Sequence, residues 1–210
     1  MKELILQIKK LRNLPIKETI DSRMSDFSSL WKESSQDLFK ELCFCLLTAN
    51  FSAHRGILIQ NAINDGFLHF DEKELAQKLA ELGHRFPNTR AKYIFNAREH
   101  SPSLKETLSQ FQNGREARLW LAKNIKGLGF KESSHFLRNI GFKDVAIIDF
   151  HIVDLLVKHD LIEKPKSRAL TPKKYEEIED VLQKLCNSVG LSQGELDLYL
   201  WYEETGKILK

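Results

Sequence analysis

Apolar residues recur every three or four positions along most of this chain, which is the spacing of an amphipathic helix. In the segment 34–46 two serines precede the repeat, and Leu38, Leu42 and Leu46 occupy the repeating positions. The segment 71–82 repeats the same spacing with three leucines. These patterns predict helices, and serine is a residue type that caps a helix start.

Start and stop signals accompany the later helical patterns. The pairs Asp71 with Glu74 and Ser192 with Glu195 form capping boxes, and Thr171-Pro172 combines a cap with a proline at the first helical position. No segment alternates apolar and polar residues long enough for a sheet, and the run 145–148 is too short, so we expect it to be a buried connection. The prediction is an all-α fold of about eight to ten helices in two compact lobes, with residues 1–210 forming a single domain.

Composition adds limits rather than a function. With 210 residues, of which 42% are hydrophobic and 29% charged, the chain can bury a core without disulfides or a structural metal. The three cysteines, Cys43, Cys45 and Cys186, form no CxxC pair. We therefore expect buried thiols in a reducing compartment, and three thiolates are too few for an iron–sulfur cluster.

The chain shows no sign of export or of membrane insertion. Its N-terminus has no long apolar region with a small-residue cleavage site, and no run approaches the length of a membrane span. We expect a cytoplasmic location. The net charge of +3 is compatible with nucleic acid, but binding would need a local basic surface rather than a global excess.

A tight hairpin is the first candidate functional feature, in the motif at about 117–140. Two helical patterns flank the turn 126–130, where Gly127 and Gly129 permit positive φ and leave backbone amides uncovered. Leu128 between them can fill the core. Free amides at a helix start, together with the helix dipole, make a phosphate site. A Gly-x-Gly turn can equally join two helices without any ligand.

Two charged residues follow the hairpin at positions that suggest catalytic roles. Lys131 stands two residues after Gly129, where burial and the helix dipole would favour an uncharged amine that attacks a sugar C1′ carbon to form a Schiff base. Asp149 lies 18 residues beyond Lys131 and opens a further helix. Its carboxylate can accept a proton and stabilise oxocarbenium charge. The alternatives are a solvated surface lysine and a simple helix cap.

Positive charge dominates the stretch 121–144. Only Glu132 and Asp144 oppose its five cations, which are Lys123, Lys126, Lys131, Arg138 and Lys143. A basic surface around exposed amides suits a DNA backbone.

In this order and spacing, Gly127-Leu-Gly129-Phe-Lys131 followed by Ile-Asp149-Phe-His151 closely resembles the helix-hairpin-helix DNA glycosylase superfamily. The resemblance implies that Lys131 and Asp149 are catalytic, and that a lysine member cuts the glycosidic bond and then nicks the strand by β-elimination. His151 would contact phosphate, or would cap and pack. Lys126 stands where many members have proline, and the missing cysteine cluster argues against the endonuclease III and adenine-glycosylase branches.

Three further stretches resemble the small archaeal-type (type 2) 8-oxoguanine DNA glycosylases over nearly the whole chain. They are Leu-Leu-Thr-Ala-Asn50-Phe-Ser, Arg85-Phe86-Pro-Asn-Thr-Arg90, and Leu-Tyr-Leu-Trp201 with the final Lys210. This resemblance implies that Phe86 and Trp201 sandwich the flipped base, although either could be core. Asn50 would intrude into the duplex, or it would end a helix.

Lys210 is the last residue of the chain. In the resembling group a terminal lysine helps to separate 8-oxoguanine from guanine. The lesion has an N7–H donor where guanine has an acceptor, so a terminal carboxylate could accept that bond. The alternative is a frayed terminus.

The sequence thus predicts a monomeric enzyme that excises 8-oxoguanine from damaged double-stranded DNA and nicks the strand. It would need no organic cofactor, it would have no membrane association, and a monovalent cation could bind among the hairpin carbonyls. In the cytoplasm it would associate with the nucleoid. The alternatives are a glycosylase for another damaged base, a non-catalytic helix-hairpin-helix DNA-binding module, and a structural helical domain.

Overall fold

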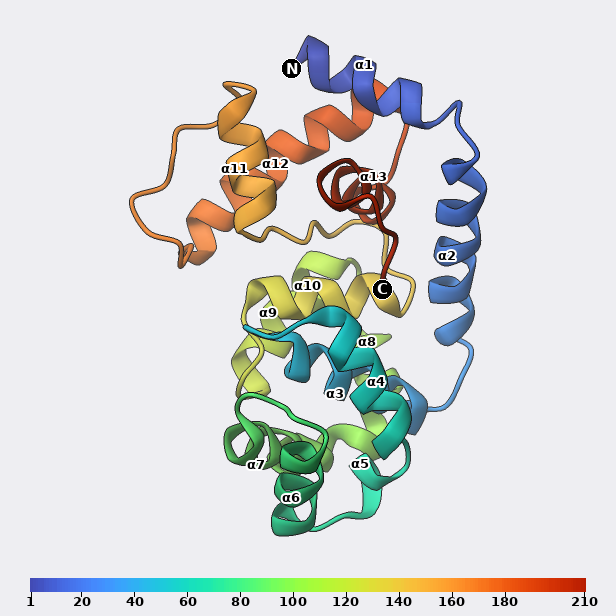
Figure 1. Cartoon of the computed structure of the whole chain (residues 1–210), viewed down its shortest axis with the longest axis vertical. Coiled ribbons are helices and arrows are strands. Elements are labelled where there is room, and N and C mark those ends of the chain that lie inside the picture. The colour runs from blue at the N-terminus through green and yellow to red at the C-terminus, as the bar shows by residue number, and fades with distance from the viewer. The chain divides into compact units, whose positions relative to one another are not determined.

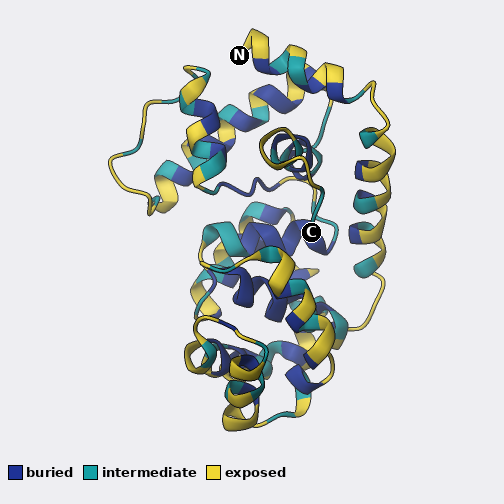
Figure 2. Cartoon of the chain, viewed as in Figure 1, coloured by how far each residue is buried: buried dark blue, intermediate teal, exposed yellow.

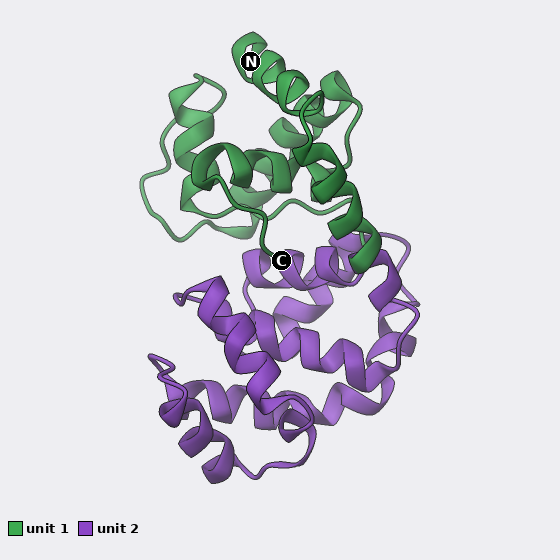
Figure 3. Ribbon diagram, turned by 45° about the vertical axis from the view of Figure 1, so that its right-hand side comes forward, with its two compact units in different colours: residues 1–26, 142–210 green, residues 27–141 purple.

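The computed structural model describes residues 1–210 and contains thirteen α-helices, one 3-10 helix and no strand (Figure 1). The all-α prediction is confirmed. The helix count exceeds the expected eight to ten because short helices such as α5 (Gly66–His69) and α8 (Leu104–Leu108) interrupt the connections. The chain divides into two compact units, shown in separate colours in Figure 3. Unit 1 is residues 1–26 with 142–210, and unit 2 is residues 27–141.

Unit 2 is built around α3 (Ser35–Thr48), whose side chains are almost all buried (Figure 2). Ser34 caps α3 by accepting the Asp37 amide at 3.1 Å. The helices that complete the unit with α5 and α8 are α4 (Ala53–Ile63), α6 (Glu72–Glu81), α7 (Pro87–Ala97), η1 (Arg98–Ser103), α9 (Gly114–Asn124) and α10 (Phe130–Asn139). Of these, α4, α7, η1 and α10 pack directly on α3, and the apolar side chains of α3 form the centre of the core.

Unit 1 collects helices from both ends of the chain. They are α1 (Lys2–Leu11), the part of α2 (Ile16–Leu30) up to residue 26, α11 (Phe150–Lys158), α12 (Pro172–Val189) and α13 (Gln193–Thr205). Both α1 and α13 pack on α12, and α11 packs on α13. The expected boundaries are confirmed: Thr171 caps α12, Gly190 ends it in the left-handed conformation, and Ser192 with Glu195 forms the capping box of α13.

The connection 145–148 is buried and extended but pairs with no strand, as expected from its length (Figure 2). Side chains of α12 take the place of a partner strand. The Ala146 amide donates to Glu179 at 2.9 Å, and the Ile148 amide donates to the Tyr175 hydroxyl at 3.1 Å. Tyr175 in turn donates to the Ala146 carbonyl at 2.7 Å. These bonds satisfy buried backbone groups that would otherwise destabilise the fold, and they hold the segment that leads to α11.

The three cysteines are free and buried, as the sequence suggested. Burial raises the pKa of Cys186 to about 12 and that of Cys43 well above its usual value, so both thiols stay protonated. None of the helices combines the length and the apolar character that crossing a membrane requires.

Candidate active site and nucleic-acid interface

The turn between α9 and α10 in unit 2 is the predicted hairpin. Leu128 is buried in it, as expected, and its amide donates to the Ile125 carbonyl at 3.2 Å. Gly127 has φ of +101°, and a Cβ atom there would lie 2.3 Å from Cδ2 of Tyr93. Both the backbone angle and the tyrosine ring therefore require glycine at position 127.

Gly129 differs from the expectation of positive φ at both glycines. Its φ is −93° and its ψ is −174°, an extended conformation that other residues also adopt, because it is the residue at which the chain enters α10. No side chain caps α10. The amides of its first turn are therefore not occupied by a cap, which is the property that the phosphate-site prediction requires.

Lys131 lies in the first turn of α10 with 29% of its side chain exposed. Its Nζ atom is 3.8 Å from Oε1 of Glu132, whose side chain is 17% exposed. From the sequence, Glu132 counted only as opposing charge and had no assigned role. Its position in the first turn of a helix was the available signal, because acids there complement the helix dipole. The structure makes Glu132 the near ionic neighbour of the predicted nucleophile.

Buried polar contacts anchor the rest of α10 within unit 2. Asn139 donates to Glu41 of α3 at 2.6 Å, and the second oxygen of Glu41 accepts from Gln60 at 3.0 Å. Arg118 of α9 donates to the Ser134 hydroxyl at 3.3 Å. Such bonds in a buried setting fix a helix in one register, since a shift would leave polar groups unpaired. By fixing the middle and the C-terminal end of α10, these bonds also fix the position of its N-terminal turn.

Asn50 lies directly after α3, with φ of +58°, and it is exposed. Ala49 is the C-cap residue of α3, and Asn50 is the residue after it, where asparagine with positive φ commonly ends a helix. Arg90 of α7 donates to the Ala49 carbonyl at 2.7 Å and so holds the turn. In the sequence, Arg90 belongs to one of the resembling stretches but had no assigned role. Its contact with the end of α3 could not be read from spacing, because 41 residues separate the partners.

Phe86 precedes α7 and is 36% exposed, so its ring is not part of the core. Its amide donates to Nδ1 of His84 at 3.0 Å, and Nε2 of His84 lies 3.0 Å from the Leu47 carbonyl. These two bonds fit the neutral imidazole with its proton on Nε2. Burial lowers the pKa of His84 and favours that neutral form. The Arg85 guanidinium lies 4.9 Å from the centre of the Phe86 ring.

In unit 1, Asp149 stands at the end of the buried extended segment and caps α11. Its Oδ1 atom accepts the Ile152 amide at 3.0 Å. The capping interpretation left open by the sequence is therefore correct. The cap accounts for one hydrogen bond to Oδ1, and the catalytic role of the carboxylate stays a prediction.

His151 and Trp201 lie together in unit 1, with ring centres 5.6 Å apart in an edge-to-face arrangement. Phe150 stacks on His151 at 3.9 Å between centres. Lys210 follows the end of α13, which Gly206 terminates, and its side chain is half-buried. The roles of these residues toward a base or a phosphate stay predictions.

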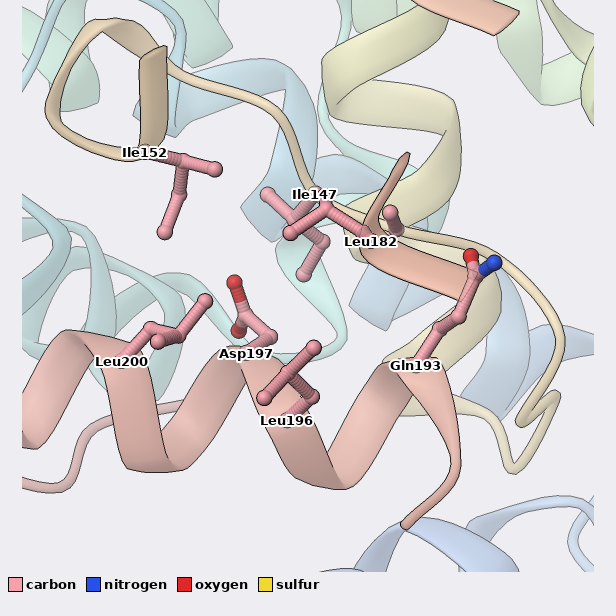
Figure 4. A pocket seen from close by; sticks show the side chains of 8 residues that line it. Ile147, Ile152, Leu182, Gln193, Leu196, Asp197 and Leu200 are labelled. Atoms are coloured by element: carbon pink, nitrogen blue, oxygen red, sulfur yellow. The ribbon is translucent and has the colours of Figure 1, made fainter. Parts of the chain in front are cut away.

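A small cavity in unit 1 lies between the extended segment, α12 and α13. Figure 4 shows Asp197 and Leu200 of α13 on one side and Ile147 and Ile152 on the other. The cavity has a volume of about 10 Å³, which suits one water molecule, whereas binding pockets for small molecules measure several hundred Å³. It is therefore too small to receive a nucleobase.

No group of three or more histidine, cysteine, aspartate or glutamate side chains in residues 1–210 could hold a metal ion. A monovalent cation among the hairpin carbonyls is a separate prediction, which needs backbone oxygens alone. The carbonyls of Ile125 and Gly129 already accept the amides of Leu128 and Ser133.

Known proteins resemble this chain over nearly its whole length. A family model described as 8-oxoguanine DNA glycosylase matches residues 20–191. An 8-oxoguanine DNA glycosylase/AP lyase of Korarchaeum cryptofilum is 51% identical over 209 residues, covering 99% of this chain and 98% of the relative.

Two solved structures from Methanocaldococcus jannaschii are also similar. The crystal structure of its 8-oxoguanine DNA glycosylase has a TM-score of 0.95 and 50% identity, and covers 100% of this chain and 97% of that one. Its 8-oxoguanine glycosylase/lyase in complex with a 15mer DNA containing 8-oxoguanine also has a TM-score of 0.95, with 49% identity and coverage of 99% and 100%. The resemblance predicted from the hairpin and its flanking motifs is confirmed, and the chain belongs to the 8-oxoguanine DNA glycosylase family.

Proposed function

We propose that this protein excises 8-oxoguanine from duplex DNA and then nicks the strand at the resulting abasic site. The observation that carries the proposal is Lys131, which lies in the first turn of a helix without a side-chain cap. Relatives that match the chain over its whole length support the substrate. One is an 8-oxoguanine DNA glycosylase/AP lyase, and another was crystallised with DNA containing 8-oxoguanine.

In the proposed reaction the Nζ lone pair of Lys131 attacks C1′ of the damaged nucleotide. The C1′–N9 bond breaks, its electrons leave with the base, and the base takes up a proton. Nζ then loses a proton and its lone pair forms a double bond to C1′, while the C1′–O4′ bond breaks and O4′ takes up a proton. The product is a protonated imine between Nζ and C1′. Removal of a C2′ proton then expels the 3′ phosphate and nicks the strand. Asp149 accepts amine protons and stabilises positive charge on the sugar.

Binding is assigned to the remaining predicted residues. Phosphate oxygens accept hydrogen bonds from the amides of Gly129 and of the α10 start, with Gly127 shaping the turn, and His151 contacts a further phosphate. Phe86 and Trp201 stack on the extruded base, with roughly 1–3 kcal/mol per stacked contact. Asn50 enters the duplex, and Lys210 contacts the base and contributes to the distinction between 8-oxoguanine, with its N7–H group, and guanine.

The chemistry proposed for Lys131 needs no organic cofactor, because the protonated imine that forms on Lys131 is itself the electron sink for removal of the C2′ proton. Backbone carbonyls of the hairpin would hold a monovalent cation, whose positive charge would strengthen phosphate binding there. We further propose that the enzyme acts as a monomer in the cytoplasm, where it associates with the nucleoid.

Borohydride trapping on a labelled duplex with one 8-oxoguanine opposite cytosine tests the function. Borohydride reduces an imine to a stable amine, so the wild-type protein is expected to give a covalent protein–DNA band. Lys131→Ala should give none. The matched control is Lys73→Ala, which removes an exposed lysine of α6 in the same unit and should trap like wild type.

The other substrates separate the competing functions. An undamaged duplex should give no band, and an abasic duplex should give one. Trapping on abasic DNA alone would keep Lys131 as the nucleophile but would contradict 8-oxoguanine as the target. DNA binding without trapping on any duplex would favour a non-catalytic binding module.

A further inference from the structure

Figure 1 shows the long loop that joins α11 to α12 in unit 1. Its sequence carries a concentrated positive charge. The segment 164–173, which runs from this loop into the first turn of α12, holds four cations and no acidic residue. These four side chains are all exposed and make no ion pair in the structure; they are Lys164, Lys166, Arg168 and Lys173. By contrast, Lys174, the next cation along the chain, is paired with Glu177 at 3.1 Å.

The loop is attached to the start of α11 by an aromatic contact. The Arg168 guanidinium lies over the ring of Phe150, 5.4 Å from its centre. Phe150 is the first residue of α11 and is 48% exposed, although it is a large apolar side chain. Its ring also stacks on His151, which contacts Trp201. A series of ring contacts thus runs from the basic loop to residues that we assign to substrate binding.

These two observations are independent and point to the same ligand chemistry. Exposed cations without acidic partners repel one another, and a polyanion relieves that repulsion while releasing counterions. An exposed aromatic ring under a guanidinium fixes the direction of that cation at little entropic cost, since the ring itself is held by its own helix. Neither feature contributes much to the core of unit 1.

We propose that residues 164–173 bind the sugar–phosphate backbone of duplex DNA beside the lesion, with Arg168 held in place by Phe150. Lys164 and Lys166 add phosphate contacts that do not depend on sequence. This inference rests on the proposed function and names a DNA-contact surface that lies outside the hairpin.

The test measures affinity for a duplex across a range of about 50 to 200 mM salt, using the full-length protein. The variant carries Lys164→Ala, Lys166→Ala and Arg168→Ala together. The matched control carries Lys2→Ala, Lys9→Ala and Lys10→Ala, which remove three exposed cations from α1 of the same unit. Circular dichroism checks that both variants stay helical.

The loop variant should bind at least about tenfold more weakly at 0.1 M salt, and its log–log salt slope should fall by about 0.9 for each lost contact. The α1 control should keep the wild-type affinity and slope. Phe150→Leu should weaken binding by less than Arg168→Ala does, because it leaves the guanidinium charge in place, and the double variant should lose less than the sum of the two single losses, because Phe150 acts in part through Arg168.

A loop variant that binds with the wild-type affinity and slope overturns the inference. The inference is also overturned if the losses in affinity from Phe150→Leu and Arg168→Ala add fully in the double variant, because the two residues would then act independently. The trapping assay distinguishes this failure from failure of the proposed function. If the wild-type protein traps 8-oxoguanine DNA and the loop variant binds DNA normally, only the proposed loop surface is contradicted. If the wild-type protein does not trap but the loop variant binds DNA more weakly, the proposed glycosylase activity is contradicted and the DNA-contact surface stands.

Discussion

The two helices that carry the proposed catalytic residues begin in opposite ways. α10 starts at Gly129, which has no side chain, and its first-turn amides receive no cap. α11 starts at Asp149, whose carboxylate accepts the Ile152 amide at 3.0 Å. One helix start is therefore open to an external anion, and the other is closed by its own anion.

The difference shows how one structural element can serve two purposes. An open start offers amide donors and a positive dipole, which favour phosphate binding beside Lys131. A closed start holds a carboxylate in one orientation, which suits a group that must handle protons and charge. Substitutions that exchange these properties between α10 and α11 test whether the difference matters.

The largest expected effect is on activity, when Asp149 is replaced by a residue that still caps α11 but carries no charge. Asn caps a helix about as well as Asp, so Asp149→Asn should change the free energy of unfolding by less than about 1 kcal/mol. It should nevertheless lower the nicking rate at least about 100-fold, because the carboxylate is lost. Asp149→Ala should lose the activity and also about 1 kcal/mol of stability. Single-turnover nicking and chemical denaturation measure the two quantities. Full activity in Asp149→Asn would mean that the residue only caps.

The next effect concerns the two glycines of the hairpin. Gly127→Ala should lower the free energy of unfolding by about 2 kcal/mol or more, because alanine is strained at φ of +101° and its Cβ would meet Tyr93. Gly129→Ala should cost less than about 1 kcal/mol, since its φ is ordinary and the nearest atom, 3.3 Å from the added Cβ, is the flexible end of Glu132. Denaturant titration compares the two variants. Equal losses would contradict the different roles assigned to the glycines.

A cap introduced at the open helix start gives a smaller and more specific effect. Gly129→Asp would make α10 begin as α11 does, with a carboxylate on its first-turn amides. We expect DNA affinity to fall about tenfold while stability changes by only a few tenths of a kcal/mol. The matched control is Asn113→Asp, which adds the same charge at the start of α9, where a cap is already present. An equal loss of affinity in both variants would mean that net charge, not the open start, is responsible.

The start of α7 gives the smallest effect and depends on pH. Phe86 donates its amide to a neutral His84, whose pKa is lowered by burial. The unfolded chain binds this proton more readily, so the stability contributed by neutral His84 is present above the ordinary histidine pKa of about 6.5 and is lost as pH falls. Thermal unfolding of wild type between about pH 7.5 and 5.5 should show a decrease in Tm that is smaller in His84→Gln. The same decrease in both proteins would assign it to other groups.

Much of this architecture was predictable because its determinants are local. The caps at Asp71, Thr171 and Ser192 lie within three residues of the amides that they bind, so the sequence shows both partners at once. The buried connection 145–148 was also predicted correctly. The sequence did not predict which groups bond to its backbone in place of a strand, because Tyr175 and Glu179 lie about thirty residues further along the chain.

The sequence by itself determined that this protein is all helical, that a Gly-x-Gly hairpin precedes Lys131, and that Asp149 opens the helix that follows. Only the tertiary structure decided that Gly127, and not Gly129, is the hairpin glycine with positive φ. It also decided that a side chain at position 127 would meet the Tyr93 ring, which comes from another helix. It also decided how α10 is anchored, since Asn139 bonds to Glu41 across 98 residues. Periodicity and capping act over a few residues, whereas these contacts form only when distant helices pack together and bury polar groups that must then find partners.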